Sequence, residues 1–436
     1  MGVVNRRLRL AKASNATDAF FVQAFGPWVE IVAVALLAAS AWQMGLLNAL
    51  SMVAFMILGI PIGVFVDRFE AVRVLKLALV AKVALAAVLV AVAASGHLTI
   101  PFLLAFATVM GIVTVATETA QVSTVPALTD HEGQISRTVA NIATWDRIAS
   151  LVAPVAVAYG VTMLGANWTL LAAVGFAVLA MILALLITKP AATQVAPGGA
   201  DDADDAGTDT DAGAETGVEA DVSDQAPAKQ SFREQVKDGW SVLVADRQLA
   251  GMTWLSAFTN AGLSMGAAVE SILVIQTLDL GVEFYGILGS LMAVSGIVAS
   301  FVSGRISDAV PVRKLYVWGG MGQCVAASLP LFAFAAPQAA VVLLIVHTMA
   351  WGIILTITNV ASQIYAATTV EQRLLGRISA FRRTLTMGLV PLGSIVGGVL
   401  GTVAGLWLPL LLWPVFTLFG VLIYMTLDRR RGPDTA

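Results

Sequence analysis

Twelve apolar stretches dominate this chain, and they constrain its fold more than any other feature. A helix needs ~20 mostly apolar residues to cross the hydrocarbon core of a bilayer. The stretches lie at residues 16–38, 44–66, 74–95, 100–125, 139–163, 167–188, 249–276, 284–306, 315–336, 339–363, 378–402 and 405–427. They lack the apolar–polar alternation that is typical of barrel strands. We therefore predict an all-α membrane protein with twelve transmembrane helices.

The composition excludes several classes of function. Of the 436 residues, 58% are apolar and 12% are charged, whereas soluble chains are about a quarter charged. A water-soluble enzyme is therefore not expected, and the basic residues form no large patch for nucleic acid. The sequence contains no GxxxxGK[ST] loop for a nucleotide. With one cysteine, Cys324, and three histidines without metal-ligand spacing, we expect no metal and no cofactor.

Lysines and arginines predict the orientation of the chain. They precede the first stretch and follow stretches 2, 4, 6, 8, 10 and 12, whereas the connections after stretches 1, 3, 5, 7, 9 and 11 contain none. Because cytoplasmic loops are enriched in basic residues, we expect both termini in the cytoplasm and a multi-pass protein of the cell (inner) membrane. Four further basic residues lie inside the stretches and are expected to reach the cytosolic surface or to lie near it: Lys82, Arg147, Arg382 and Arg383.

An acidic segment divides the chain into two halves. Residues 190–228 contain ten aspartates and glutamates and no lysine or arginine. Such a composition does not bury enough apolar surface to fold, so we predict a disordered cytoplasmic linker that tethers residues 1–189, the first six-helix half, to residues 229–436. The second half begins with an amphipathic pattern at Phe232, Val236, Trp240 and Leu243, followed by six stretches.

The two halves share motifs at a nearly constant separation. Three residues at and just after the end of stretch 2 reappear 241 positions later, at the end of stretch 8: Gly63, Asp67 and Arg73 correspond to Gly304, Asp308 and Lys314. Pro154 and Gly160 in stretch 5 correspond to Pro391 and Gly397, 237 positions later. Internal repeats of this kind are common in transporters. We therefore predict two six-helix pseudo-repeats.

Residues 63–73, GVFVDRFEAVR, resemble the signature loop between spans 2 and 3 of the major facilitator superfamily, without its later glycine. Residues 40–47, 376–382 and 391–398 are similar to a bacterial subgroup of enterobactin-exporter-like and macrolide-efflux-like proteins. The resemblance implies the twelve-helix fold of that superfamily and a transport function. Stretch 5 has Ala153-Pro154 where antiporters of the superfamily often have Gly-Pro.

The signature loop suggests a cytoplasmic gate. A carboxylate at Asp67 can cap the positive N-terminus of a neighbouring helix, and Arg68 or Arg73 can pair across the loop. Gly63 is the fourth residue of this predicted gate. The corresponding gate residues of the second half are Gly304, Asp308 and Lys314. These contacts would hold the halves together at the cytosolic side. The alternative is that the charges only direct membrane insertion.

Three carboxylates lie deep in predicted spans, where a charge is costly: Glu30, Glu118 and Glu270. Each is a candidate for binding and releasing a coupling proton, and each is alternatively a neutral structural residue. Arg147 lies at a depth similar to that of Glu118, so the two are candidates for a buried ion pair.

Few polar or aromatic residues are available inside the spans to contact a substrate. We predict that the cavity includes Gln23, Trp28, Gln121, Asn260, His347 and Asn359. A lining of this kind suits a bulky, largely apolar organic compound. The sequence therefore predicts a proton-coupled exporter that contacts its substrate, protons and lipid. Alternatives are a dedicated metabolite or siderophore exporter, an importer of the same fold, or a transport-inactive receptor or scaffold.

Overall fold

The computed structural model describes residues 2–129, 132–188, 240–241 and 243–429. Within these ranges the side chains of 2–5, 54–60, 63–68, 132, 372–377 and 380 are not described. The predicted linker at 190–228 and residues Phe232 and Val236 lie outside the described residues. Trp240 and Leu243 lie within them: the Trp240 ring makes an edge contact with Phe381, and Leu243 is buried beside Leu249.

Every regular element in the described part of the chain is helical, as the sequence predicts. The first half contains α1 (Gly2–Ile31), η1 (Val32–Leu36), α2 (Ala41–Arg68), α3 (Ala71–Ala94), α4 (Ile100–Leu128), α5 (Glu132–Leu164) and α6 (Ala166–Leu185). The second contains α8 (Arg247–Ile272), η2 (Leu273–Thr277), α9 (Gly281–Ala309), α10 (Val312–Ala335), η3 (Pro337–Ala339), α11 (Ala340–Thr369), α12 (Gln372–Val403) and α13 (Trp407–Arg429).

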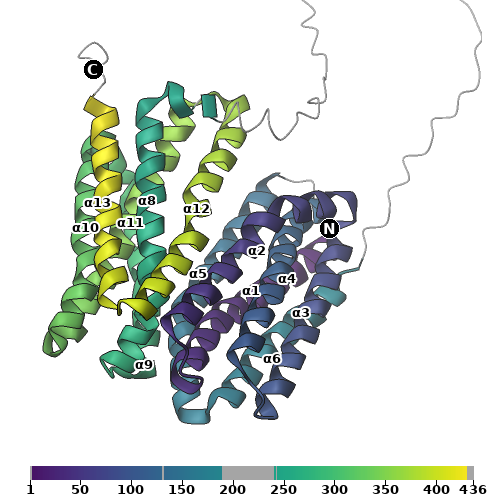
Figure 1. Cartoon of the computed structure of the whole chain (residues 1–436). Helices are drawn as coiled ribbons and strands as arrows, with labels where there is room; N and C mark the ends of the chain where they lie inside the picture. Colours follow the sequence, from purple (N-terminus) through teal and green to yellow (C-terminus); the bar gives the residue numbers. More distant parts are fainter. Residues whose placement is uncertain (1, 130–131, 189–239, 242, 430–436) are drawn as a thin grey trace, which may run out of the picture.

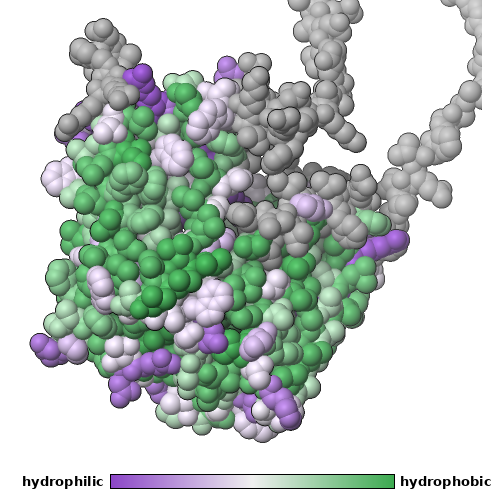
Figure 2. All heavy atoms as spheres, viewed as in Figure 1, coloured by the Kyte–Doolittle hydropathy of each residue, from purple (hydrophilic) through white to green (hydrophobic). Residues whose placement is uncertain are grey.

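Eleven helices among the described residues are long and apolar enough to cross a membrane. The remaining long helix, α2, has 28 residues, and many of its side chains lie outside the description. Large apolar side chains point outward from the helices, including Phe301, Trp318 and Val403, each at least three-quarters exposed. Apolar side chains cover much of the face in Figure 2. An apolar surface of this extent suits a hydrocarbon solvent.

The helices form two groups, α1–α6 and α8–α13 (Figure 1). The groups converge at the lower end of the view and diverge at the upper end, where α1 begins and α13 ends. An even number of membrane crossings requires this placement of the two ends. The twelve-helix prediction is therefore confirmed at the level of architecture.

The backbone repeats itself between the halves. Short π-helical segments, η1 and η2, continue α1 and α8 and begin at Val32 and Leu273, a shift of 241. A non-glycine residue with positive φ follows each segment: Ala38 at 50° and Asp279 at 51°. Such conformations are uncommon outside glycine. Their recurrence at the spacing of the sequence motifs supports the predicted pseudo-repeat.

Close backbone packing joins the halves at the converging end. A Cβ on Gly45 of α2 would lie 2.9 Å from the Gly398 Cα of α12, so only glycine permits this approach. Nearby, Thr402 Oγ1 accepts from the Trp42 backbone N–H at 2.8 Å, and Gln276 Nε2 donates to the Val34 carbonyl at 2.7 Å. Small residues allow helices to pack closely where lipid provides no hydrophobic driving force.

Candidate functional site

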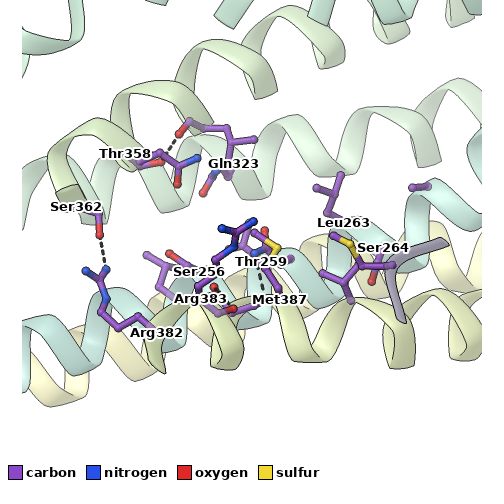
Figure 3. A pocket seen from close by; sticks show the side chains of 18 of the residues that line it. Ser256, Thr259, Leu263, Ser264, Gln323, Thr358, Ser362, Arg382, Arg383 and Met387 are labelled. Carbon is purple, nitrogen blue, oxygen red and sulfur yellow. Dashed lines mark hydrogen bonds between the residues drawn. The ribbon is translucent and has the colours of Figure 1, made fainter. Parts of the chain in front are cut away.

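A cavity of about 1040 Å³ lies between the two halves. The first half contributes five residues, all from α1 and α2: Gly26, Glu30, Asn48, Ser51 and Met52. The larger wall comes from α8, α10, α11 and α12 and carries many hydroxyl, amide and guanidinium groups (Figure 3). Size and lining are those of a small-molecule site. The cavity extends to Ala367 and Arg383, toward the end at which the two groups of helices diverge.

A second cavity of about 280 Å³ adjoins the first and shares Gly26, Glu30 and Leu263 with it. It brings together two of the predicted carboxylates, Glu30 from α1 and Glu270 from α8. The Tyr285 hydroxyl of α9 donates a hydrogen bond to Glu30, so this bond crosses from one half to the other. His347 lies in the same cavity and is buried, with Nδ1 2.6 Å from the Ala326 carbonyl oxygen.

Glu30 and Glu270 occupy nearly equivalent positions in the repeat. Glu30 precedes η1 by two residues and Glu270 precedes η2 by three. The two predicted candidates are therefore neighbours on opposite halves, beside the packed end. Tyr285 was not predicted, because its approach to Glu30 depends on how the two halves dock.

The third carboxylate, Glu118, lies elsewhere. It is exposed on α4, and Arg147 is exposed on α5. No ion pair joins these two residues in the described structure, so that pairing stays a prediction. Next to Arg147, Asp146 Oδ1 accepts a hydrogen bond from Gln23 Nε2 at 3.1 Å, which ties α5 to α1.

A buried ion pair does exist in the first half, between residues that were not predicted to pair. Lys82 Nζ of α3 lies 2.7 Å from Asp18 Oδ1 of α1, and both side chains are almost fully buried. Gln121 Nε2 of α4 donates to Asp18 Oδ2 at 2.9 Å. Lys82 therefore does not reach the cytosolic surface, because the Asp18 carboxylate binds it inside the helix bundle. The sequence contained one indication of such a pair, because a lysine inside an apolar stretch needs a carboxylate partner if it is buried.

The other predicted cavity residues separate into two groups. Asn260 and Asn359 line the larger cavity, and Asn260 Nδ2 donates to the Thr386 carbonyl at 3.2 Å. Trp28 is fully buried in the core of the first half, where its Nε1 donates to the Ala166 carbonyl at 2.9 Å. Neither described cavity includes Trp28, Gln23 or Gln121.

The predicted gate residues are only partly described. Gly63, Asp67 and Arg68 belong to the last turns of α2, and their side chains lie outside the description. Arg73 Nε lies 2.7 Å from Glu70 Oε2, its neighbour at the start of α3. In the second half Gly304, Asp308 and Lys314 are exposed, and neither Asp308 nor Lys314 forms an ion pair with another described residue. Arg313 instead pairs with Asp428 at the end of α13.

Residues 13–382 match the model of the Major Facilitator Superfamily. This match covers most of the chain. The chain belongs to the major facilitator superfamily. It is therefore a multi-pass membrane protein with the family and fold of transporters.

Solved structures with the same fold include a mutant of the nucleoside transporter NupG, with a TM-score of 0.71, 13% identity and coverage of 98% of this chain and 99% of that one. A bacterial homologue of the human lysosomal transporter Spinster has a TM-score of 0.66, 14% identity and coverage of 99% of this chain and 98% of that one. A bacterial homologue of the iron transporter ferroportin has a TM-score of 0.67, 11% identity and coverage of 98% and 99%. No curated protein matches the sequence, and the exporter-like subgroup stays a prediction.

Proposed function

We propose that this chain is a secondary transporter that exports a small organic compound by alternating access, driven by inward proton movement. The cavity between the halves carries this proposal. It is lined by both halves, and the halves contact each other at the packed end, where α2 meets α12, η1 meets η2 and α5 meets α9. With both termini in the cytoplasm of a bacterial cell, the cavity faces inward, ready to take its compound from the cytosol.

Proton coupling is assigned first to Glu30 and Glu270. Both line the small cavity beside the packed end, and Glu30 accepts a hydrogen bond from Tyr285 of the other half. When the halves separate at this end, that bond breaks and Glu30 becomes accessible from outside. A carboxyl group at this contact between the halves can bind a proton from outside and release it to the cytosolic side after the halves close at the packed end. Glu118, exposed on α4, is the alternative proton carrier.

The cavity wall suggests an amphiphilic compound. Apolar groups such as Leu255, Leu263 and Met387 alternate with Asn260, Asn359 and other hydrogen-bonding groups. A purely apolar compound would displace water from these polar groups without satisfying their remaining donors and acceptors, which costs binding free energy. We therefore propose a substrate that is more polar than the sequence-based expectation.

A paired experiment tests the function. Compounds whose accumulation differs between cells with and without the chain are first identified in a drug and metabolite screen. Each is then added to inverted membrane vesicles with an acidic interior. We expect uptake that collapses with the pH gradient, and proton release when the compound is added.

Three variants locate the proton carrier: Glu30→Gln, Glu270→Gln and Glu118→Gln. The carrier's variant should still bind the compound but should neither concentrate it nor release protons. Glu283→Gln at the start of α9, outside both described cavities, is the control. Absence of any compound whose flux depends on the gradient would contradict the proposal. Movement of the compound out of the inverted vesicles, instead of into them, would favour an importer.

A further inference from the structure

Two adjacent arginines lie on the wall of the larger cavity. Arg382 and Arg383 are on α12, about ten residues from its start, and both line the cavity (Figure 3). The other charged residue among those that line it is Glu30, which also borders the small cavity. Arginine inside a membrane-spanning helix is costly. Two of them on one wall therefore need a physical explanation.

Neutral hydroxyl groups hold the Arg382 guanidinium in place. Its Nε donates to Thr253 Oγ1 of α8 at 2.9 Å. Its Nη2 donates to Ser362 Oγ of α11, a bond drawn in Figure 3. These bonds fix the plane of the guanidinium and use two of its five N–H donors. No carboxylate is ion-paired with Arg382 among the described contacts. The side chain is thus oriented without being neutralised.

The acidic residue whose charge acts on Arg382, Asp246, is engaged elsewhere. Its Oδ1 caps α8 by accepting from the backbone N–H groups of Gln248 and Leu249, at 2.9 and 3.1 Å. Its Oδ2 accepts from the Tyr365 hydroxyl at 2.9 Å. The Arg382 guanidinium therefore keeps three of its N–H donors for an anion that enters the cavity.

We propose that Arg382 and Arg383 form an anion subsite that binds a carboxylate or phosphate group of the transported compound. A guanidinium with fixed orientation can bind such a group through two parallel hydrogen bonds. Neighbouring amides and hydroxyls, among them Asn359, Gln363 and Ser379, line the same cavity and bind polar parts of the compound. The inference rests on the proposed function and names its substrate class: organic anions with an apolar portion.

Equilibrium binding tests the subsite without any flux measurement, so its failure is distinguishable from failure of the transport proposal. Purified full-length protein in detergent is dialysed against three probes of equal size: 2-naphthoate, 2-naphthylmethanol and 2-naphthylmethylamine. We expect 2-naphthoate to bind at least about tenfold more tightly than the other two, because a hydrogen bond to a charged group is stronger than a neutral one.

Variants separate binding from structure. Arg383→Gln and Arg382→Gln should each remove most of the preference for 2-naphthoate, and Arg382→Lys should restore only part of it, because lysine lacks the forked geometry. Arg137→Gln removes an exposed arginine of α5 outside both described cavities and should leave the preference unchanged. The proposal is overturned if 2-naphthoate binds no more tightly than the neutral or cationic probe. It is also overturned if the double variant Arg382→Gln/Arg383→Gln keeps the preference for 2-naphthoate.

Discussion

Lys82 Nζ lies 2.7 Å from Asp18 Oδ1 in the interior of the first half, joining α3 to α1 where both side chains are almost fully buried. The Lys82 ammonium also lies 5.9 Å from the centre of the Phe21 ring. A buried pair of this kind is costly to form from two solvated ions, yet removing only one partner costs more, because the other charge is left uncompensated.

Lys82→Met should therefore destabilise the protein by about 3–5 kcal/mol, and the double variant Asp18→Asn/Lys82→Met should recover much of that loss. Equilibrium unfolding in mixed detergent micelles measures both. Arg73→Met is the control, because its ion pair with Glu70 is largely exposed and should contribute less than ~1 kcal/mol. Equal losses for the single and double variants would contradict a role for the ion pair.

Gly45→Val should prevent the halves from closing at their packed end, because its side chain would meet the backbone of α12 at Gly398. We expect a larger outward-facing population. It can be measured with Asn48→Cys, a cavity residue, in a Cys324→Ser background. An impermeant maleimide added outside should label Asn48→Cys faster when Gly45→Val is present.

Gly175→Val is the control for that experiment, since a Cβ at Gly175 meets nothing within 4 Å. Unchanged labelling with Gly45→Val would show that α2 and α12 tolerate separation without reorienting the halves.

Tyr285→Phe removes only the hydroxyl that bonds to Glu30 across the halves. A hydrogen bond to a charged group contributes about 1.5–3 kcal/mol, so its loss should shift the equilibrium at least about tenfold toward the outward-facing state, in which this bond is broken. The rate of external labelling of Asn48→Cys measures the shift, and flux and proton release in vesicles measure its effect on transport. Tyr159→Phe on an exposed part of α5 is the control. Equal rates for the two variants would rule out a role for the Tyr285 hydroxyl.

Asp67→Asn keeps the size of the side chain and removes its charge. Since the sequence motif predicts a cytoplasmic clasp, we expect normal expression, a strong loss of transport and a shift toward the inward-facing state. External labelling of Asn48→Cys should then slow. Transport at the original rate would reduce Asp67 to a residue that directs membrane insertion.

Deletion of residues 200–224 should leave transport largely intact, because the acidic composition predicts a tether and the remaining chain is expected to span the halves. Transport in vesicles is compared with that of the full-length protein at matched expression. Loss of transport with normal membrane insertion would assign the segment a further role.

The sequence by itself determined the fold class. Apolar stretches of membrane-spanning length leave the backbone no solution but helices, because hydrocarbon offers it no hydrogen-bond partners. The repeat was also readable, since Gly63, Asp67 and their counterparts recur at the separation that relates η1 to η2. Deep carboxylates such as Glu30 stood out because charge is rare in such stretches.

Only the tertiary structure decided which of these groups meet. Asp18 and Lys82 are 64 positions apart, and Tyr285 is 255 positions from Glu30. Helical periodicity gives the face of each helix but not its rotation or neighbours in the bundle, which depend on the packing of many apolar side chains at once. For the same reason Trp28 packs in the core of one half, whereas Arg382 lies on the cavity wall with its hydroxyl partners on two other helices.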